Sequence, residues 1–182
     1  MLLKNLQKLA WLAVISLALA GTTSGQSPKN PEQVQRRETI NSFQLNPIGT
    51  VKRQDKQAYL ELLPQYAPAL DGLAGFSHLW VFYWFHGNDN PEERATLKVH
   101  PRRDPTNPLT GVFATRSPVR PNLIGLTACR ILRVTGNTVQ VEGLDAKDGS
   151  PIIDLKPYIP KGDSIPEATT PDWVKKPPPK TD

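Results

Sequence analysis

The chain of 182 residues contains a single cysteine and only three histidines. With Cys129 alone, no disulfide can form within the chain, and three histidines without ligand spacing do not support a metal site. The sequence also has no glycine-rich phosphate loop and no dinucleotide-binding fingerprint, so a nucleotide-containing cofactor would need another architecture. No serine or cysteine triad can be read from it either, and the catalytic residues stay unidentified.

Long hydrophobic runs are missing as well. The N-terminal apolar stretch, residues 9–20, has about a dozen residues, whereas a membrane span needs about twenty. Two lysines precede it, and Ala18 and Ala20 occupy the small-residue positions expected before a cleavage site. We therefore expect a signal peptide over residues 1–20, cleaved after Ala20 or, as second choice, after Gly25. This predicts an exported protein, periplasmic or extracellular, with no stable membrane span after cleavage; without a signal peptide the protein would be cytoplasmic.

Composition divides the rest of the chain into three parts. Residues 21–42 are polar and contain two prolines, which indicates a flexible linker. Residues 43–166, about 120 in number, are enough to bury a core. The tail, residues 167–182, is rich in proline and lysine, and we expect it to be disordered or loosely docked. The net charge of +5 permits attraction to nucleic acid, but several lysines lie in the signal region and the tail, so charge alone decides little.

Short apolar runs separated by turn residues predict a mainly β fold, an antiparallel barrel or sandwich with minor helix. The strongest strand is 77–85, SHLWVFYWF, which is apolar on both faces. One face should meet the core, and the other a helix, a loop or a partner subunit. Gly136 and Asn137 predict a hairpin turn. The other expected strands are 44–52, 58–63 (a strand or a helical turn), 97–100, 112–115, 124–134, 138–142 and 152–155.

Residues 111–125, GVFATRSPVRPNLIG, combine two arginines with two prolines. Pro118 and Pro121 fix their own φ and bias the residues before them away from helix, so the loop should be stiff. A stiff loop that presents Arg116 and Arg120 suits a carboxylate or phosphate ligand, because little ordering entropy is left to lose. On these residues alone, a solvated turn with two surface arginines is the alternative.

Two further groups of polar residues carry candidate chemistry. His100, Arg102 and Arg103 form a second basic group, which suits either an anion patch for an RNA backbone or an ordinary exposed turn. Asp145, Lys147, Asp148 and Asp154 cluster in a turn between two expected strands. The acidic side chains there suit either ribose hydroxyls or an amine of a ligand, or hydrogen bonds to their own backbone.

Three blocks of the sequence, in this order, resemble the TsaA-like (TrmO) family of tRNA N6-methyltransferases. The blocks are GLAGFSHLWVFYWFH at 72–86, GVFATRSPVRPNLIGL at 111–126 and LDAKDGSPIIDLKPYIP at 144–160. The resemblance runs from Leu45 to about Pro166. It implies a compact antiparallel β-barrel (the class VIII methyltransferase fold), a homodimer, and S-adenosylmethionine bound near the subunit interface. It also implies methylation of N6 in a threonylcarbamoyl-modified adenosine beside the tRNA anticodon.

The resemblance assigns roles to individual residues. Positioning of the methyl donor and acceptor can supply much of the rate of such a reaction, so no nucleophilic triad is required. If the two arginine-bearing loops lie at the same end of the barrel, their basic charge makes Arg102, Arg103 and Arg120 the residues expected to face the RNA. The residues that the resemblance places around the cofactor are His86, Gly87, Arg116, Leu126, Leu144, Asp145, Ala146 and Lys147.

The sequence departs from the family after its first strand. Members usually carry a longer segment there, with a Pro-Arg-Gln element that helps hold the cofactor. Here residues 50–57, TVKRQDKQ, run almost directly into AYLELL. Lys52, Arg53 and Gln54 are the candidates to replace that element, although their spacing differs. Together with the signal-like N-terminus, this departure favours an alternative: an exported, non-catalytic binding module that retains the barrel.

Overall fold

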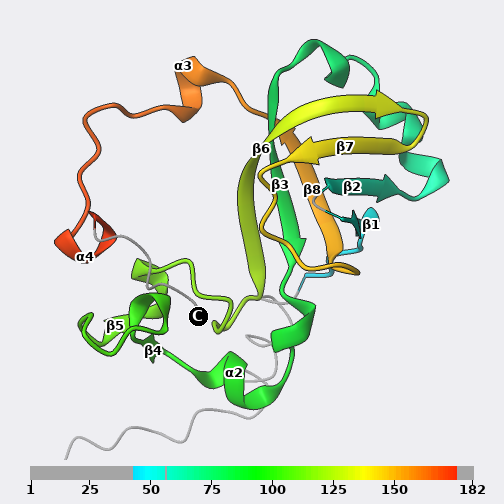
Figure 1. Ribbon diagram of the computed structural model, residues 1–182. Helices are drawn as coiled ribbons and strands as arrows, with labels where there is room; N and C mark the ends of the chain where they lie inside the picture. Colours follow the sequence, from blue (N-terminus) through cyan, green and yellow to red (C-terminus); the bar gives the residue numbers. More distant parts are fainter. Residues whose placement is uncertain (1–42, 56, 176–182) are drawn as a thin grey trace, which may run out of the picture. The chain divides into compact units, whose positions relative to one another are not determined.

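Six antiparallel strands close into a barrel within residues 43–55 and 57–175, the part of the chain that the computed structural model describes. The strand order around the barrel is β1-β2-β7-β6-β3-β8, with β8 pairing back to β1 (Figure 1). The predicted signal peptide and the linker up to residue 42 lie outside the described residues. The strands are β1 Gly49–Gln54, β2 Gln57–Leu62, β3 His78–Trp84, β6 Ile124–Thr135, β7 Thr138–Glu142 and β8 Pro151–Pro157.

Alternation along the strands explains how the barrel fills its core. In β3 the side chains of Leu79, Val81 and Tyr83 are buried, whereas those between them are half-buried. This is the period of two that puts alternate residues on opposite faces of a strand. The core cluster consists of Val51, Ala58, Leu60, Leu62, Leu70, Leu79, Val81, Tyr83, Cys129, Val139, Val141, Leu144, Ala146 and Ile152.

Short connections fix the order of the strands. The β6–β7 hairpin turns at the predicted Gly136 and Asn137, where Gly136 has a φ of 58°. The Asn137 side-chain amide also donates to the carbonyl of Leu62 at 2.6 Å, which ties this hairpin to β2. Between β1 and β2 only two residues intervene, because Gln54 pairs directly with Gln57.

The connection from β3 to β6 forms a lobe outside the barrel (Figure 1). It contains α2 Pro91–Ala95 and a small sheet of β4 Lys98–Val99 and β5 Thr110–Gly111. The predicted strand at 112–115 is wrong. Residues Val112–Ala114 form a 3-10 turn instead, in which the amide of Thr115 donates to the carbonyl of Val112 at 3.1 Å.

The remaining elements are short. The segment between β2 and β3 contains two 3-10 helices, Pro64–Leu70 and Leu73–Gly75. After β8 come α3 Pro160–Asp163 and α4 Asp172–Lys175. Among the described residues, no helix is long and apolar enough to cross a membrane. The prediction of a mainly β, antiparallel barrel with minor helix is confirmed.

Candidate cofactor site

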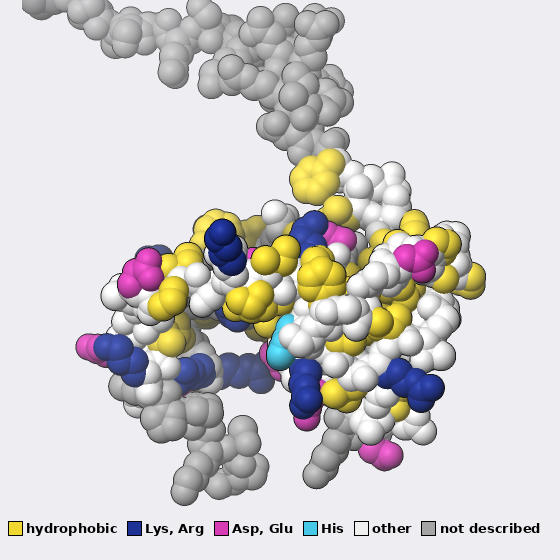
Figure 2. Space-filling view, turned by 90° about the horizontal axis from the view of Figure 1, so that it is seen from above, with side chains coloured by type: hydrophobic (Ala, Val, Ile, Leu, Met, Phe, Trp, Pro, Cys, Tyr) yellow, Lys and Arg dark blue, Asp and Glu magenta, His cyan; other side chains and the backbone are white. Residues whose placement is uncertain are grey.

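A cavity of about 450 Å³ opens where the lobe rejoins the barrel. The cavity lies between aromatic side chains from the end of β3, the arginine loop (residues 111–125) and the first residues of β6. Figure 2 shows basic side chains bordering a hollow in one face of the molecule. The residues that line the cavity are Phe82, Tyr83, Phe85, Phe113, Thr115, Arg116, Arg120, Asn122, Ile124, Gly125, Leu126 and Asp145.

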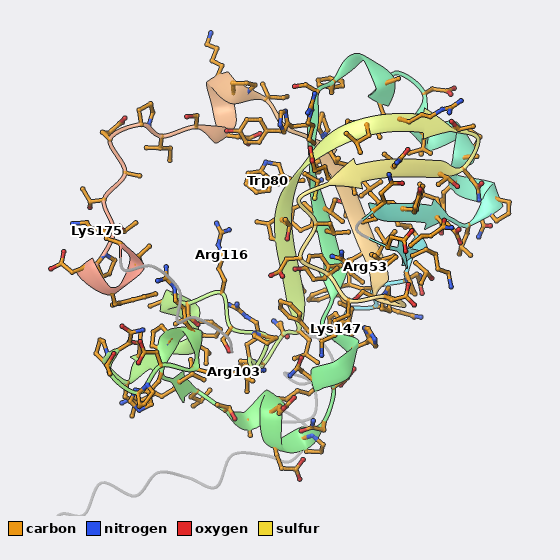
Figure 3. The ribbon with its side chains drawn as sticks, in the orientation of Figure 1. Arg53, Trp80, Arg103, Arg116, Lys147 and Lys175 are labelled. Carbon is orange, nitrogen blue, oxygen red and sulfur yellow. The ribbon has the colours of Figure 1, made fainter. Side chains whose placement is uncertain are left out.

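The two arginines of the loop have different environments. Arg120 is half-buried, and its guanidinium donates to the carbonyls of Thr115 and Ser117, at 3.4 Å each. Arg116 is exposed, and no other described residue accepts a hydrogen bond from its side chain. Figure 3 shows the Arg116 side chain projecting from the loop. Arg120 therefore braces its own loop, whereas Arg116 is available to an anionic ligand.

Side-chain hydrogen bonds stiffen the loop further, as its prolines predict. The Thr115 hydroxyl accepts from the amide of Ser117, and the Ser117 hydroxyl accepts from the amide of Val119, both at 3.2 Å. These are local turn bonds of the Ser/Thr type. They hold the backbone around Arg116 in one conformation before any ligand binds, which lowers the entropic cost of binding.

Tyr83 contributes an aromatic wall at the barrel end of the cavity. Its ring meets Phe85 edge to face at 5.4 Å, and its hydroxyl lies 3.3 Å from the Thr127 hydroxyl. Burial raises the pKa of Tyr83 above its ordinary value, so the phenol stays protonated near neutral pH. Gly125, its partner on β6, leaves room for this ring, because a Cβ at Gly125 would lie 2.5 Å from a ring carbon.

Asp145 reaches the cavity from the connection between β7 and β8. Its neighbours Leu144 and Ala146 are buried at the end of the barrel, so the alternation turns Asp145 and Lys147 outward. Of the predicted stretch 144–147, Asp145 lines the cavity, whereas the side chains of Leu144 and Ala146 pack into the core.

Arg53 holds this connection in place. Its guanidinium donates to the carbonyl of Ala146 at 2.8 Å and also to the carbonyl of Leu144, and its amide donates to the Asp148 carboxylate at 2.8 Å. The sequence makes Arg53 a candidate to replace the missing Pro-Arg-Gln element. The structure places its guanidinium on backbone carbonyls, so Arg53 positions the Asp145 loop.

His86 and Gly87 lie beside the cavity. They follow β3 in a 3-10 turn, His86–Asn88, and neither is among the residues that line the cavity. The His86 Nδ1 atom is 3.2 Å from the Ser150 hydroxyl, and the position of a Cβ on Gly87 would be 3.5 Å from the Lys147 ammonium. This turn and the Asp145 loop therefore adjoin. The assignment of these residues to a cofactor stays a prediction.

An anchor that sequence reasoning missed joins the lobe to β3. The Asp89 carboxylate accepts from Arg94 Nε at 2.7 Å and from Trp84 Nε1 at 2.9 Å. Arg94 also lies over the Trp84 ring and donates to the carbonyl of Pro121 at 3.2 Å. The hydrogen bonds from Arg94 and then Trp84 lower the pKa of Asp89. In the sequence these residues are only a polar turn, because the bond to Pro121 spans 27 residues.

Other chemistry finds little support in the described part of the chain. It contains no group of three or more His, Cys, Asp or Glu side chains that could hold a metal ion. Burial raises the pKa of the Cys129 thiol to about 12, so this core cysteine is protonated and is not an activated nucleophile. Arg102 and Arg103 do not line the cavity of Arg116 and Arg120; they line a second pocket in the lobe.

A family model described as the tRNA-methyltransferase O N-terminal domain matches residues 36–164. The chain belongs to this family. A relative from Methanocaldococcus jannaschii, named "Probable S-adenosyl-L-methionine-binding protein", is 43% identical over 121 residues, covering 66% of this chain and 96% of the relative. A relative from Mus musculus, named "tRNA (adenine(37)-N6)-methyltransferase", is 47% identical over 96 residues, covering 53% of this chain and 22% of the relative.

Solved TrmO structures share the fold. A TrmO crystal structure from Pseudomonas aeruginosa has a TM-score of 0.55 and 29% identity, covering 70% of this chain and 61% of that chain. Another TrmO crystal structure has a TM-score of 0.58 and 33% identity, covering 76% of this chain and 66% of that one. The chain thus spans slightly less than two thirds of the length of these structures. The family predicted from the three sequence blocks is confirmed.

Proposed function

We propose that the protein is an S-adenosylmethionine-dependent methyltransferase of the TrmO family that methylates N6 of an adenosine in tRNA. The observation that carries this proposal is the cavity at the end of the barrel, within the 129 residues (36–164) that match the family. S-adenosylmethionine-dependent methyl transfer is supported by the family and by the names of its relatives. The choice of a tRNA adenosine as the substrate is supported by the name of the mammalian relative.

The residues of the cavity fit the chemical groups of the cofactor. Its volume, 450 Å³, is typical of small-molecule sites. Phe82, Phe85 and Tyr83 offer aromatic surface to an adenine ring. The free guanidinium of Arg116 suits a carboxylate, and the carboxylate of Asp145 suits an ammonium group or ribose hydroxyls. When bound, S-adenosylmethionine supplies an electrophilic methyl group on a positively charged sulfur.

The chain's own residues contribute positioning. The hydrogen bonds of the arginine loop hold the backbone around Arg116, and Arg53 holds the backbone of the loop that carries Asp145, so both loops are set before the ligands bind. Pre-set geometry of this kind accelerates transfer between two bound molecules, because the entropy of orientation has already been lost.

Titration of the full-length chain with S-adenosylmethionine, followed by transfer of radiolabelled methyl to tRNA, tests the proposal. Removing a charge-assisted hydrogen bond costs about 1.5–3 kcal/mol, so Arg116→Gln should bind the cofactor about 10–100-fold more weakly. Arg133→Gln, at an exposed position of β6 outside the cavity, is the matched control and should bind like the wild type. Absence of binding to the wild type at millimolar cofactor would refute the proposal.

The rival proposal is an exported binding module without methyl transfer. The short β1–β2 connection favours it, since only two residues join the strands and the guanidinium of Arg53, a candidate to replace the Pro-Arg-Gln element, donates to backbone carbonyls. Cofactor binding without methyl transfer to any tRNA would support this version. N-terminal sequencing of the mature protein, in fractionated cells, tests export: a chain beginning at Gly21 supports it, and an intact chain in the cytoplasm contradicts it.

A further inference from the structure

A second pocket, of about 320 Å³, lies in the lobe next to the cofactor cavity. Its walls come from the segment after β4 and from the arginine loop. Thr115 lines both pockets, so the two are neighbours across this residue. The residues that line the second pocket are Val99, His100, Arg102, Arg103, Thr115, Ser117, Pro118 and Val119.

The backbone at Arg102 and Arg103 is unusual. Their φ angles are 60° and 57°, in the left-handed region that residues other than glycine rarely adopt. Such a conformation costs on the order of 1 kcal/mol or more per residue and persists where the surroundings impose it. Here the amide of Arg103 donates to the carbonyl of His100, and the buried Asn107 donates to the carbonyl of Pro101 at 3.0 Å. The lobe therefore holds two consecutive arginines in an enforced conformation beside the pocket.

The two guanidinium groups differ in their partners. Arg102 Nη2 donates to the carbonyl of Val174 at 2.7 Å, which fixes its side chain. No other described residue forms a hydrogen bond or ion pair with the side chain of Arg103. Asp104 turns one carboxylate oxygen to the amide and hydroxyl of Thr106, at 2.9 and 2.7 Å. No carboxylate lines the pocket, so its charged side chains are basic.

His100 adds a hydrogen-bonding group in which the partner of Nδ1 indicates the tautomer. Its Nδ1 atom is 2.8 Å from the carbonyl oxygen of Asn107. Because a carbonyl oxygen only accepts, Nδ1 must carry the proton, and the Nε2 atom of the neutral ring is then an acceptor. An acceptor of this kind suits the 2′-hydroxyl that distinguishes RNA from DNA.

We propose that this pocket binds a phosphodiester and its ribose, from the RNA strand whose adenosine enters the neighbouring cavity. This inference rests on the proposed function and names the part of the substrate that the lobe holds. The guanidinium fork of Arg103 matches phosphate oxygens, and Val99, Pro118 and Val119 offer apolar surface to the sugar. The shared wall at Thr115 puts the phosphate next to the reaction site.

Fluorescence anisotropy with a labelled anticodon stem–loop RNA and the full-length chain tests the inference at several salt concentrations. Arg103→Gly is the informative variant, because glycine adopts a positive φ freely, so the side chain with its guanidinium is removed without adding backbone strain. Its affinity should fall about tenfold, and the slope of log K against log salt should become shallower by about 0.7–0.9, the change expected for one lost phosphate contact. Arg133→Gln should leave both values unchanged. An unchanged slope in Arg103→Gly would overturn the proposal.

Two further measurements separate this inference from its alternatives. Arg103→Gly should keep the wild-type affinity for S-adenosylmethionine. A wild-type chain that does not bind the cofactor would instead refute the proposed function, independently of the RNA measurement. A stem–loop of the same sequence made of DNA should bind more weakly than the RNA, and equal affinity would overturn the ribose contact. Binding of inorganic phosphate that requires Arg103, without binding of RNA, would assign the pocket to free phosphate and overturn the RNA assignment.

Discussion

Gly125 sets how closely β6 approaches the aromatic wall of the candidate site. A Cβ at this position would lie 2.5 Å from the buried ring of Tyr83, closer than real Cβ contacts. Tyr83 is packed against Phe85 and cannot move without disturbing the core. We expect Gly125→Ala to lower the free energy of unfolding by about 1–3 kcal/mol, the usual cost of overpacking, measured by urea denaturation.

Gly75 provides the matched control for this substitution. No atom lies within 4 Å of the position of a Cβ there, and its φ is not positive. Gly75→Ala should therefore leave the urea midpoint nearly unchanged. Equal stability of Gly125→Ala and the wild type would show that the Tyr83 ring can shift at little cost.

The arginine loop shows what a sequence reveals about single residues and what it does not. Its prolines and its two arginines are enough to predict a stiff, basic loop, and the structure agrees. The sequence pattern treats Arg116 and Arg120 alike. They differ because Arg120 folds back onto the carbonyls of its own loop, at 3.4 Å, which depends on how the chain turns in space. The exposure of Asp145 likewise follows from burial of its neighbours, which only the closed barrel determines.

At the level of elements, β1 holds the loop between β7 and β8 through Arg53. This side chain reaches across 91–93 residues of sequence to two backbone carbonyls. A hydrogen bond contributes about 0.5–1.5 kcal/mol, so Arg53→Ala should speed hydrogen exchange at residues 144–150 by about tenfold. Mass spectrometry of exchanged peptides measures this directly, and the affinity for S-adenosylmethionine should fall along with it.

Lys52 offers a neighbouring control on the same strand. It is exposed on β1 and forms no hydrogen bond or ion pair with another described side chain. Lys52→Ala should leave exchange at residues 144–150 unchanged. If Arg53→Ala also left it unchanged, the loop would hold its conformation without Arg53, and the positioning role would be wrong.

Most elements of the barrel could be predicted because strand-forming residues and turn residues are local signals. The strand over 77–85 and the hairpin at Gly136 follow directly from them, and the structure has β3 and the β6–β7 turn there. The expected strand at 112–115 failed for a physical reason. Val112 is apolar and β-branched, but it is buried in a 3-10 turn and the pairing with β4 ends at Gly111. Tertiary burial overrides strand propensity at such short segments.

At the scale of the whole molecule, the lobe between β3 and β6 brings the candidate site together. It supplies the arginine loop and both basic residues of the second pocket, and Asp89 and Arg94 anchor it to the end of β3. Neither pocket could be predicted from the sequence, because each is formed by segments that are distant in the sequence and meet only when the lobe is anchored to β3. Of the candidate residues, the structure places Arg116, Arg120, Leu126 and Asp145 at one cavity and His100, Arg102 and Arg103 at the other, and the remaining ones line neither.

We propose that the protein functions as a homodimer that associates through the outer face of β3. Trp80 and Phe82 are half-buried on this face, and Leu126, opposite Phe82 on β6, is 38% exposed. An aromatic patch of this kind favours a partner surface, and loss of a central tryptophan typically costs 2 kcal/mol or more of binding energy. Trp80→Ala should therefore weaken dimerisation by about 30-fold or more, measured by analytical ultracentrifugation over a range of concentrations. Leu132→Ala, at the far end of β6, should dimerise like the wild type, and a wild-type chain that stays monomeric at every concentration would refute the dimer.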